Sequence, residues 1–222
     1  RILVRFAEFR SRDFPDLYRR THRLPWGRFI RPETSLSFRV TCHASRLNHT
    51  TRIAETLESA ANQALGRSTN PAGKNPQMVM VRVVDDQVAI SIDSSGELLH
   101  RRGYRQAVTV APLRETLAAG ILRLLDWQGA SPLTDPMCGS GSFLLEGALL
   151  AQNQAPGLNR SFAFMHWPGF RDGLWTLLRG EAKRAVKAQP LAINGSDESP
   201  QAVAAAKAVS YTHLTLPTKR IV

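Results

Sequence analysis

Residues 133–148 read LTDPMCGSGSFLLEGA, and this stretch decides the fold class of the second half of the chain. Its first residues predict a short strand that ends at Asp135, and FLLEGALLA (143–151) predicts a helix. Gly139 and Gly141 let the backbone of the intervening turn come close to a ligand, and the helix directs its free N–H groups to the same place. The pattern is typical of a cofactor-binding strand, turn and helix.

The composition of this turn indicates which cofactor it suits. The dinucleotide pattern G-x-G-x-x-G requires a third glycine where this chain has Leu144, and the chain contains no G-K-[ST] phosphate loop. Asp135 at the strand end would repel a pyrophosphate and suits a ligand with a positive or hydroxyl-bearing part, such as S-adenosylmethionine. The next predicted strand, 191–197, ends on Asp197, where a carboxylate in this architecture accepts hydrogen bonds from ribose hydroxyls.

The elements around the turn follow the order of a doubly wound α/β domain. Residues 112–126 predict a helix with Pro112 in its first turn. Its apolar residues at helical spacing predict one buried face: Leu117, Ile121, Leu124 and Leu125. Residues 174–188 predict another helix, and a further helix follows Ser199. This order indicates part of a Rossmann-like domain: helix, strand, glycine turn, helix, strand, acidic residue and helix.

The first part of the chain has a different pattern. Hydrophobic spacing predicts, in chain order, a helix, a strand, a helix and two strands: 12–22, 36–42, 50–65, 78–84 and 87–93. The second helix is expected to begin with a threonine cap, and Asp85-Asp86 is a hairpin signal between the last two strands. The last four of these elements, in the order strand, helix, strand and strand, indicate a small α+β module. Residues 96–110 are expected to form a connector.

Charge indicates an acidic partner. The net charge is +11, and residues 1–50 hold eleven arginines against four acidic residues. Arginine binds phosphate bidentately and stacks on bases, so RNA or DNA is the expected partner. No apolar run approaches the ~18 residues of a membrane helix, and two cysteines, Cys42 and Cys138, provide neither a disulfide framework nor a zinc site. A reducing cytoplasm is the expected location, with no metal and no membrane partner.

The motifs quoted so far resemble one family. D-P-M-C-G-S-G-S-F-L-L-E (135–146) is similar to the cofactor motif of THUMP-domain class I RNA methyltransferases, whose pattern is close to D-P-M-C-G-S-G-T followed by an acid in the helix. L-H-R-R-G-Y-R (99–105) and A-P-L-R-E-T-L-A-A (111–119) resemble the linker and the helix that precede that motif in the family. The order of elements ahead of them resembles a THUMP module. Bacterial large-subunit rRNA guanine-N2 methyltransferases are the most similar members.

This resemblance implies an α+β THUMP-like RNA-binding region followed by a partial α/β Rossmann-like methyltransferase domain. S-adenosyl-L-methionine is then the cofactor, 23S rRNA or its precursor is the RNA partner, and the exocyclic N2 of a guanine is the methyl acceptor. The expected boundaries are 1–95 for the ferredoxin-like and THUMP region, 96–110 for the linker, 111–208 for the first half of the methyltransferase domain, and 209–222 for a non-native tail in which the last helix has ended.

The resemblance also implies roles for individual residues. Those expected to bind the cofactor are Asp135, Pro136, Cys138, Gly139, Gly141, Ser142, Asp197 and Glu198. The expected RNA contacts in the linker are Arg101, Arg102 and Arg105. Glu146 is expected to brace the loop, with Arg114, Glu115 and Thr116 on the helix beside the cofactor. Two positions depart from the family pattern: Ser142 replaces the usual Thr, and Gly147 replaces the usual Ala.

The family's Asn/Asp-Pro-Pro-Tyr/Phe segment, which holds the target amine, does not occur in the 222 residues. No catalytic residue is therefore assigned, and the chain is expected to be a fragment without methyl transfer of its own. Three alternatives stay open: an RNA-binding module with an inactive transferase half, a DNA adenine methyltransferase, and a nicotinamide-dependent oxidoreductase. Cys138 as a nucleophile is less favoured than Cys138 as a small thiol packed in the glycine turn.

Overall fold

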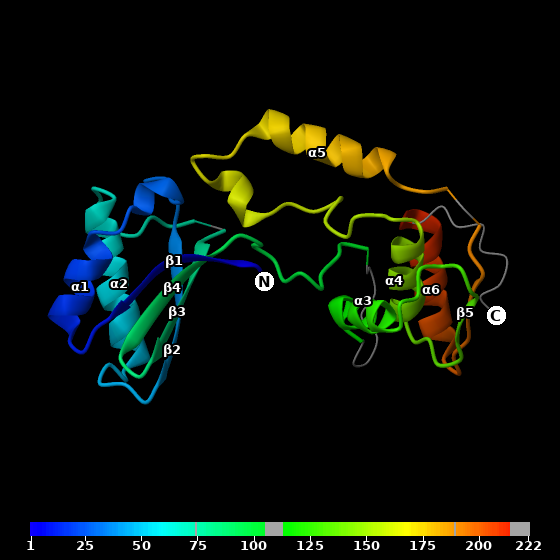
Figure 1. Ribbon diagram of the computed structural model, residues 1–222, viewed down its shortest axis with the longest axis horizontal. Coiled ribbons are helices and arrows are strands. Elements are labelled where there is room, and N and C mark those ends of the chain that lie inside the picture. Colours follow the sequence, from blue (N-terminus) through cyan, green and yellow to red (C-terminus); the bar gives the residue numbers. More distant parts are fainter. Residues whose placement is uncertain (74, 105–112, 189, 214–222) are drawn as a thin grey trace. The chain divides into compact units, whose positions relative to one another are not determined.

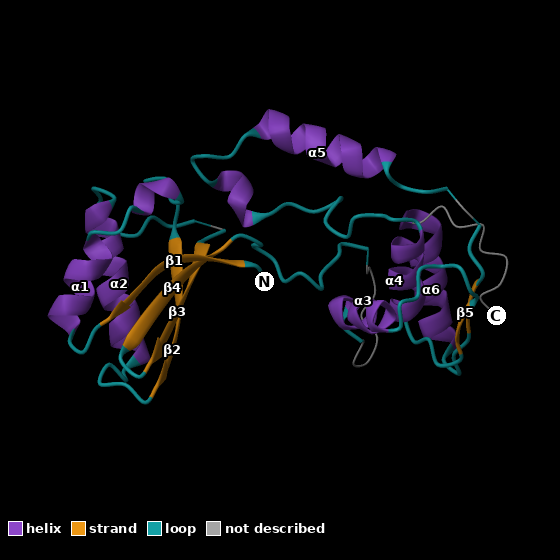
Figure 2. Cartoon of the chain, viewed as in Figure 1, coloured by secondary structure: helices purple, strands orange, loops and turns teal. Residues whose placement is uncertain are grey.

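The computed structural model describes residues 1–73, 75–104, 113–188 and 190–213 (Figure 1). The chain divides into two compact units. Unit 1 contains residues 1–98 together with residues 161–171, and unit 2 contains residues 99–160 and the chain from Asp172 onward. Unit 1 holds both strands and helices, and unit 2 is mostly helical (Figure 2).

Unit 1 is built on a four-stranded sheet with two helices on one face (Figure 1). From one edge to the other, the strands are β1 (Leu3–Arg10), β4 (Gln87–Asp93), β3 (Gln77–Val84) and β2 (Leu36–His43). β4 is antiparallel to β1 and to β3, whereas β2 is parallel to β3. The helices are α1 (Phe14–His22) and α2 (Thr50–Ala64), with short 3-10 turns η1 (Trp26–Arg28) and η2 (Ala163–His166).

The core of unit 1 follows the period of each element. Alternate residues of β3, such as Val79 and Val83, are fully buried with Leu17 of α1 and with Ile53 and Leu57 of α2. Strands bury every second residue on one face and helices bury a stripe, so the two patterns meet in one layer. The five elements predicted between residues 12 and 93 are confirmed, and the Asp85-Asp86 hairpin has the positive φ values of its turn type, +50° and +62°.

Two features of unit 1 differ from the sequence-based expectations. β1 was not predicted, because a register shift between Arg5 and Ala7 breaks its alternation of exposed and half-buried residues. The prediction that a threonine caps α2 is wrong. His49 is the N-cap, and its side chain accepts a hydrogen bond from the Arg52 N–H, so Thr50 is already the first helical residue.

The described residues of unit 2 form two parallel strands and four helices. The strands are β5 (Leu133–Asp135) and β6 (Ile193–Gly195), and the helices are α3 (Glu115–Leu124), α4 (Ser142–Ala151), α5 (Asp172–Arg184) and α6 (Pro200–His213). The predicted strand, glycine turn and helix are confirmed. α6 continues to His213, so the expected break after Ala208 is wrong. The first helix-breaking residue after Ala208 is Pro217, and β-branched residues only weaken a helix.

The buried face of α3 differs from the prediction. Glu115, Ala118 and Leu122 are buried, whereas Leu117 is 53% exposed and Leu124 is 88% exposed. Helical spacing identifies an apolar face but not the element that covers it. Among the described residues α3 packs against α4, and this contact uses the other face. In the part of the chain that the structure describes, no helix is long and apolar enough to cross a membrane.

Candidate functional site

The candidate site lies at the carboxyl ends of β5 and β6. The strands are parallel, and Asp135 pairs with Gly195. Asp197 follows β6 by two residues, so Asp135 and Asp197 belong to the same edge of the sheet. The turn 136–141 leads from β5 into α4 at this edge. Ligands of open α/β sheets bind at such carboxyl ends, so the predicted cofactor turn occupies the expected place.

Two glycines give the turn its conformation. Gly139 has φ +52° and Gly141 has φ +80°, the left-handed region that favours glycine. Gly141 is the N-cap of α4, and a Cβ added there would lie 3.1 Å from the Cβ of Ala206 on α6. Gly141 therefore permits both the backbone angle and the close approach of α6.

Asp197 joins the turn to the start of α6. Its Oδ2 accepts a hydrogen bond from the Gly139 N–H at 2.8 Å, and its Oδ1 accepts one from the Ser199 N–H at 2.9 Å. These backbone hydrogen bonds, first that from Ser199 and then that from Gly139, lower the pKa of Asp197 below its ordinary value. The carboxylate is therefore charged at neutral pH and holds the turn in a fixed position relative to β6.

The backbone of the turn is also tied to β6. The Ser196 N–H donates to the Asp135 carbonyl at 3.0 Å, and the Cys138 N–H donates to the Ser196 carbonyl at 2.9 Å. Asp135 Oδ1 accepts from the Met137 N–H at 3.1 Å, and Pro136 supplies a carbonyl to the Ser196 hydroxyl at 3.3 Å. Asp135 and Pro136 thus shape the first half of the turn.

Cys138 is buried under the turn. Burial, followed by the negative charges of Asp135 and Asp197, raises the pKa of its thiol. A Cβ added at Gly195 would lie 3.2 Å from the Cys138 Cβ and 2.3 Å from Leu144 Cδ1. A buried thiol kept neutral and packed against a strand backbone is a poor nucleophile, which favours the packing interpretation of Cys138.

Ser142 and Glu198 have different surroundings. Ser142 is 5% exposed, and its hydroxyl donates to the Leu113 carbonyl at 3.1 Å, which fixes the start of α4 to the residues before α3. Glu198 is exposed at the sheet edge.

Gly147, the other departure from the family pattern, allows close packing in the middle of α4. A Cβ there would lie 2.7 Å from Leu133 Cδ2 and 3.3 Å from the Trp127 ring.

A buried carboxylate on α4 holds the linker. Glu146 is 2% exposed, and its Oε1 accepts from the Tyr104 hydroxyl at 2.9 Å. The Arg102 guanidinium donates to both of its oxygens at 3.3 Å. Burial raises the pKa of Glu146, Arg102 and Tyr104 oppose the shift, and Glu115 adds to it. Sequence analysis missed Tyr104, although it lies within the linker motif that carried the resemblance.

This network changes the interpretation of the linker arginines. The side chain of Arg102 is only 11% exposed and is paired with Glu146, which disfavours the predicted RNA contact of Arg102. Arg101 is exposed, and Arg105 lies outside the described residues. An arginine count alone does not separate a phosphate contact from an internal ion pair.

Exposed arginines do gather on the face of the unit 1 sheet opposite the helices. Arg39 pairs with Met80, Met80 with Ser91, and Ser91 with Arg5, so these residues form a row across all four strands on one face. Arg82 lies in the adjacent row and is also exposed. Arg5 forms an ion pair with Glu8, whereas no ion pair within the described ranges involves Arg39 or Arg82.

Among the described residues no group of three or more His, Cys, Asp or Glu side chains could hold a metal ion. The polar groups at the site are two carboxylates, the backbone of a glycine turn and the N-termini of α4 and α6. This set can accept hydrogen bonds from hydroxyls and face a positively charged ligand.

Two family models match the chain. The model of the RMKL-like methyltransferase domain matches residues 102–213, and the model of the THUMP domain matches residues 11–93.

Relatives and solved structures agree with these models. The chain is 35% identical over 214 residues to "Putative RNA methyltransferase slr0064" of Synechocystis sp.. The aligned region covers 93% of this chain and 56% of that protein. It is 38% identical over 198 residues to "Ribosomal RNA large subunit methyltransferase K/L" of Cellvibrio japonicus, covering 84% of this chain and 26% of that protein. A solved structure described as "SMU.472, a putative methyltransferase complexed with SAH" superposes with a TM-score of 0.83 at 31% identity, covering 95% of this chain and 58% of that one. The chain thus spans about half the length of the first relative and about a quarter of the second.

Proposed function

The chain belongs to the RMKL-like methyltransferase family, and we propose that it binds S-adenosyl-L-methionine at the shared edge of β5 and β6 as part of an RNA methyltransferase. One observation carries the proposal: Asp135 ends β5, Asp197 follows the adjacent parallel strand β6 by two residues, and Asp197 itself holds the neighbouring glycine turn in place. The relative solved with SAH supports this choice of cofactor.

The residues of the site suit different parts of this cofactor. Asp197 uses two backbone hydrogen bonds, but a carboxylate has about four lone-pair positions, so it can still accept from ribose hydroxyls. Asp135 would hold the end of the ligand that carries the sulfonium and amino charges, and the turn residues Cys138, Gly139, Gly141 and Ser142 would support that end. Glu198, next along the chain, would contact the adenine. The bound cofactor supplies an electrophilic methyl group, and the protein's part is to hold and orient it.

Unit 1 is the proposed RNA-binding part. The THUMP model matches most of its sheet and helices, and its open sheet face presents Arg39 and Arg82. The proposed target is the exocyclic N2 of a guanine in 23S-type rRNA. The large-subunit rRNA relative supports the rRNA class, and the guanine N2 rests on the motif resemblance. The relatives named as RNA methyltransferases make a DNA adenine methyltransferase the less favoured alternative.

Calorimetry tests the cofactor assignment. S-adenosylmethionine, its demethylated product and NAD are titrated into the wild-type chain, into Asp197→Ala and into Asp172→Ala. Asp172 is the matched control, because it is an exposed acid at the start of α5. We expect Asp197→Ala to weaken cofactor binding by about 1–3 kcal/mol, the range for a lost hydrogen bond to a charged group, and Asp172→Ala to have no effect. The assignment would be overturned if the wild-type chain and Asp197→Ala bound S-adenosylmethionine with equal affinity, or if the wild-type chain bound NAD more tightly than S-adenosylmethionine.

The RNA surface has its own test. We expect Arg39→Ala and Arg82→Ala to weaken binding to a structured large-subunit rRNA fragment and to lower the salt slope by about 0.7–0.9 for each lost phosphate contact. Arg19→Ala is the control, because Arg19 is exposed on α1 in the opposite layer and pairs with Asp16. An unchanged slope in both sheet variants would remove this face from the proposal.

Radiolabelled methyl transfer by the complete gene product, with unmodified rRNA and DNA as acceptors, distinguishes the remaining alternatives. Transfer to guanine N2 of rRNA is expected. Transfer to DNA alone would indicate a DNA methyltransferase. RNA binding without any transfer would indicate an inactive transferase half.

A further inference from the structure

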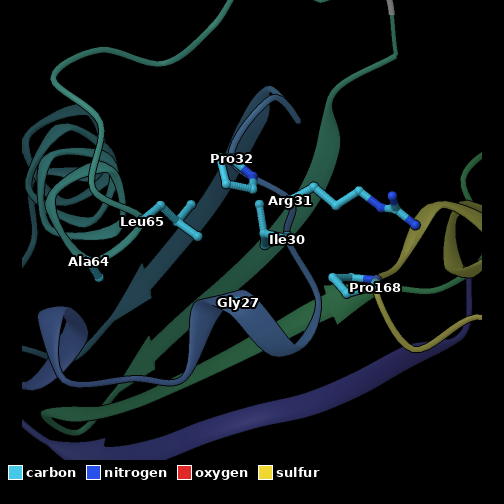
Figure 3. A pocket seen from close by; sticks show the side chains of 7 residues that line it. All are labelled: Gly27, Ile30, Arg31, Pro32, Ala64, Leu65 and Pro168. Carbon is cyan, nitrogen blue, oxygen red and sulfur yellow. The ribbon is translucent and has the colours of Figure 1, made fainter.

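A pocket in unit 1 lies beside the η1 turn, at the end of α2 (Figure 3). Its volume is about 490 Å³, within the range of ligand sites in proteins. All the described residues that line it belong to unit 1, including Pro168, which is part of residues 161–171. The pocket shares no lining residue with the cofactor turn or with the arginines of the open sheet face. It is therefore a separate candidate site.

The floor of the pocket is apolar and fixed. Ile30 is 1% exposed, and in Figure 3 it lies between Leu65, just after α2, and Pro168. The Ile30 N–H donates to the carbonyl of Trp26 at 2.9 Å, and Trp26 is buried in the core of unit 1. The floor therefore keeps its shape whether or not a ligand is bound.

Hydrogen bonds also hold both walls. On one side, the guanidinium of Arg67, which follows α2, donates to the Pro32 carbonyl at 2.6 Å. On the other side, the Trp167 indole donates to the buried Gln77 side chain at 2.9 Å, which fixes the neighbouring Pro168. A preformed cleft loses little conformational freedom when a ligand enters, and this favours binding.

Arg31 supplies the charge of the pocket. Its Nε donates to the His166 carbonyl at 3.2 Å, and no hydrogen bond or ion pair within the described ranges uses its two terminal nitrogens. A guanidinium can donate from both of these nitrogens to one phosphate. Arg23 and Arg28 are exposed in the same segment, and the described lining residues include no acidic side chain. The pocket therefore favours a negatively charged ligand.

An apolar cleft with a guanidinium at its side suits a nucleotide. The flat faces of a base can be enclosed by apolar side chains, and its phosphate is an anion that a guanidinium binds. A base within a duplex is paired and stacked, so it reaches a pocket only after it leaves the stack. An RNA ligand of this pocket must therefore offer an unpaired nucleotide.

We propose that this pocket holds one unpaired nucleotide of the RNA that unit 1 binds, with the base over Ile30 and the phosphate on Arg31. The inference rests on the proposed function, because it requires unit 1 to bind RNA. The arginines of the open sheet face bind phosphates in any RNA, whereas the pocket selects RNAs that contain an unpaired nucleotide.

The test measures the affinity of the chain for two RNA stems that differ only in one bulged nucleotide. Fluorescence anisotropy compares the wild type with Gly27→Leu, Arg31→Ala and Gly173→Leu. Gly27 lines the pocket, and a Cβ added there meets no neighbouring atom within 4 Å, so the leucine occupies the pocket. Gly173 on α5 is equally open and lies outside the pocket, which makes it the matched control. Circular dichroism melting of each variant reports its folding.

We expect the wild type and Gly173→Leu to bind the bulged stem about five- to tenfold more tightly than the paired stem, at the lower end of the values for one enclosed base. Gly27→Leu should bind both stems as the wild type binds the paired one. Arg31→Ala should lower the salt slope by about 0.7 for the bulged stem and leave the slope for the paired stem unchanged, because one phosphate contact is lost.

The outcomes separate this inference from the proposed function. Equal binding of both stems by the wild type overturns the inference and leaves RNA binding by the sheet face intact. A folded Gly27→Leu that keeps the preference overturns it too. If Gly27→Leu does not fold, an unchanged salt slope in Arg31→Ala overturns it.

Guanosine monophosphate, titrated by calorimetry, distinguishes the source of the nucleotide. Binding that Gly27→Leu abolishes, together with equal binding of the two stems, would make the ligand a free nucleotide and overturn the assignment to RNA. A wild-type chain that binds neither stem contradicts the proposed function of unit 1, and the inference falls with it.

Discussion

Removal of the Glu146 carboxylate should loosen unit 2 and release the linker. Glu146 is buried on α4 and is joined to Tyr104 and Arg102, residues 42 and 44 positions away in the sequence. Truncation to Ala would leave the Arg102 guanidinium, whose side chain is 11% exposed, without its partner. It would also leave the Tyr104 hydroxyl, in a residue that is 7% exposed, without its acceptor.

The distances set the magnitude of this effect. Breaking a buried ion pair by removing one partner costs about 3–5 kcal/mol when the geometry is good. Here the contacts from Arg102 are 3.3 Å, longer than the ~2.7–2.9 Å of strong charge-assisted bonds, whereas the Tyr104 bond is 2.9 Å. We therefore expect about 3 kcal/mol for Glu146→Ala. We expect about 1–2 kcal/mol for Glu146→Gln, which keeps the volume and an acceptor for Tyr104.

Hydrogen exchange followed by mass spectrometry measures this cost locally. Peptides from α4 report the opening free energy of unit 2, and peptides from β3 in unit 1 serve as an internal control. Adding Arg102→Met to Glu146→Gln should recover part of the loss, because the unpaired buried charge is then gone. Equal protection of α4 in wild type and Glu146→Ala would refute the assignment of this network as the anchor of the linker.

Three further predictions concern unit 2. Gly195→Ala should destabilise it by about 1–3 kcal/mol in thermal denaturation, because the added Cβ would lie 2.3 Å from Leu144 Cδ1, whereas Gly120→Ala on α3, where no neighbouring atom lies within 4 Å, should not. Burial raises the pKa of Glu146, so the folded state keeps that proton to higher pH than the unfolded chain. The stability of unit 2 should therefore fall as pH rises from the ordinary glutamate value to the raised one, and a denaturation series should show no such slope in Glu146→Gln. The pKa of Asp197 is lowered, so calorimetry should find no Asp197-dependent change in cofactor affinity between about pH 5 and 8.

The glycine turn was predictable because its determinants are local. A strand, two glycines and a helix follow one another in the sequence, and each residue type has one structural reason to be there. The position of Asp197 followed from the same logic, because the carboxyl ends of neighbouring parallel strands share an edge. What sequence reasoning did not supply was the way Asp197 uses its oxygens. Both accept backbone hydrogen bonds, and those bonds make it a brace for the turn as well as a candidate ligand.

The features that sequence analysis missed depend on distant partners or on irregular backbone. The bulge in β1 breaks a period of two, so a strand with clear apolar residues was not recognised. Arg102 lies in a basic run that suggested phosphate contact, but its partner is 44 residues away on α4. Trp167 and Gln77 are 90 residues apart, and no local pattern links a tryptophan in a loop to an amide at the start of a strand.

The linker and residues 161–171 are each fixed by hydrogen bonds to a buried polar side chain. Tyr104 and Arg102 hold the linker to Glu146, and Trp167 holds residues 161–171 to Gln77. Apolar contacts alone would tolerate sliding, whereas buried hydrogen bonds have one satisfied geometry and a high cost for any other. Because Glu146 lies on the helix that begins at the glycine turn, a displaced linker strains the same helix that begins at the proposed cofactor site. Substitutions at Glu146 should therefore affect cofactor binding in unit 2 through geometry, although Glu146 is not proposed to touch the cofactor.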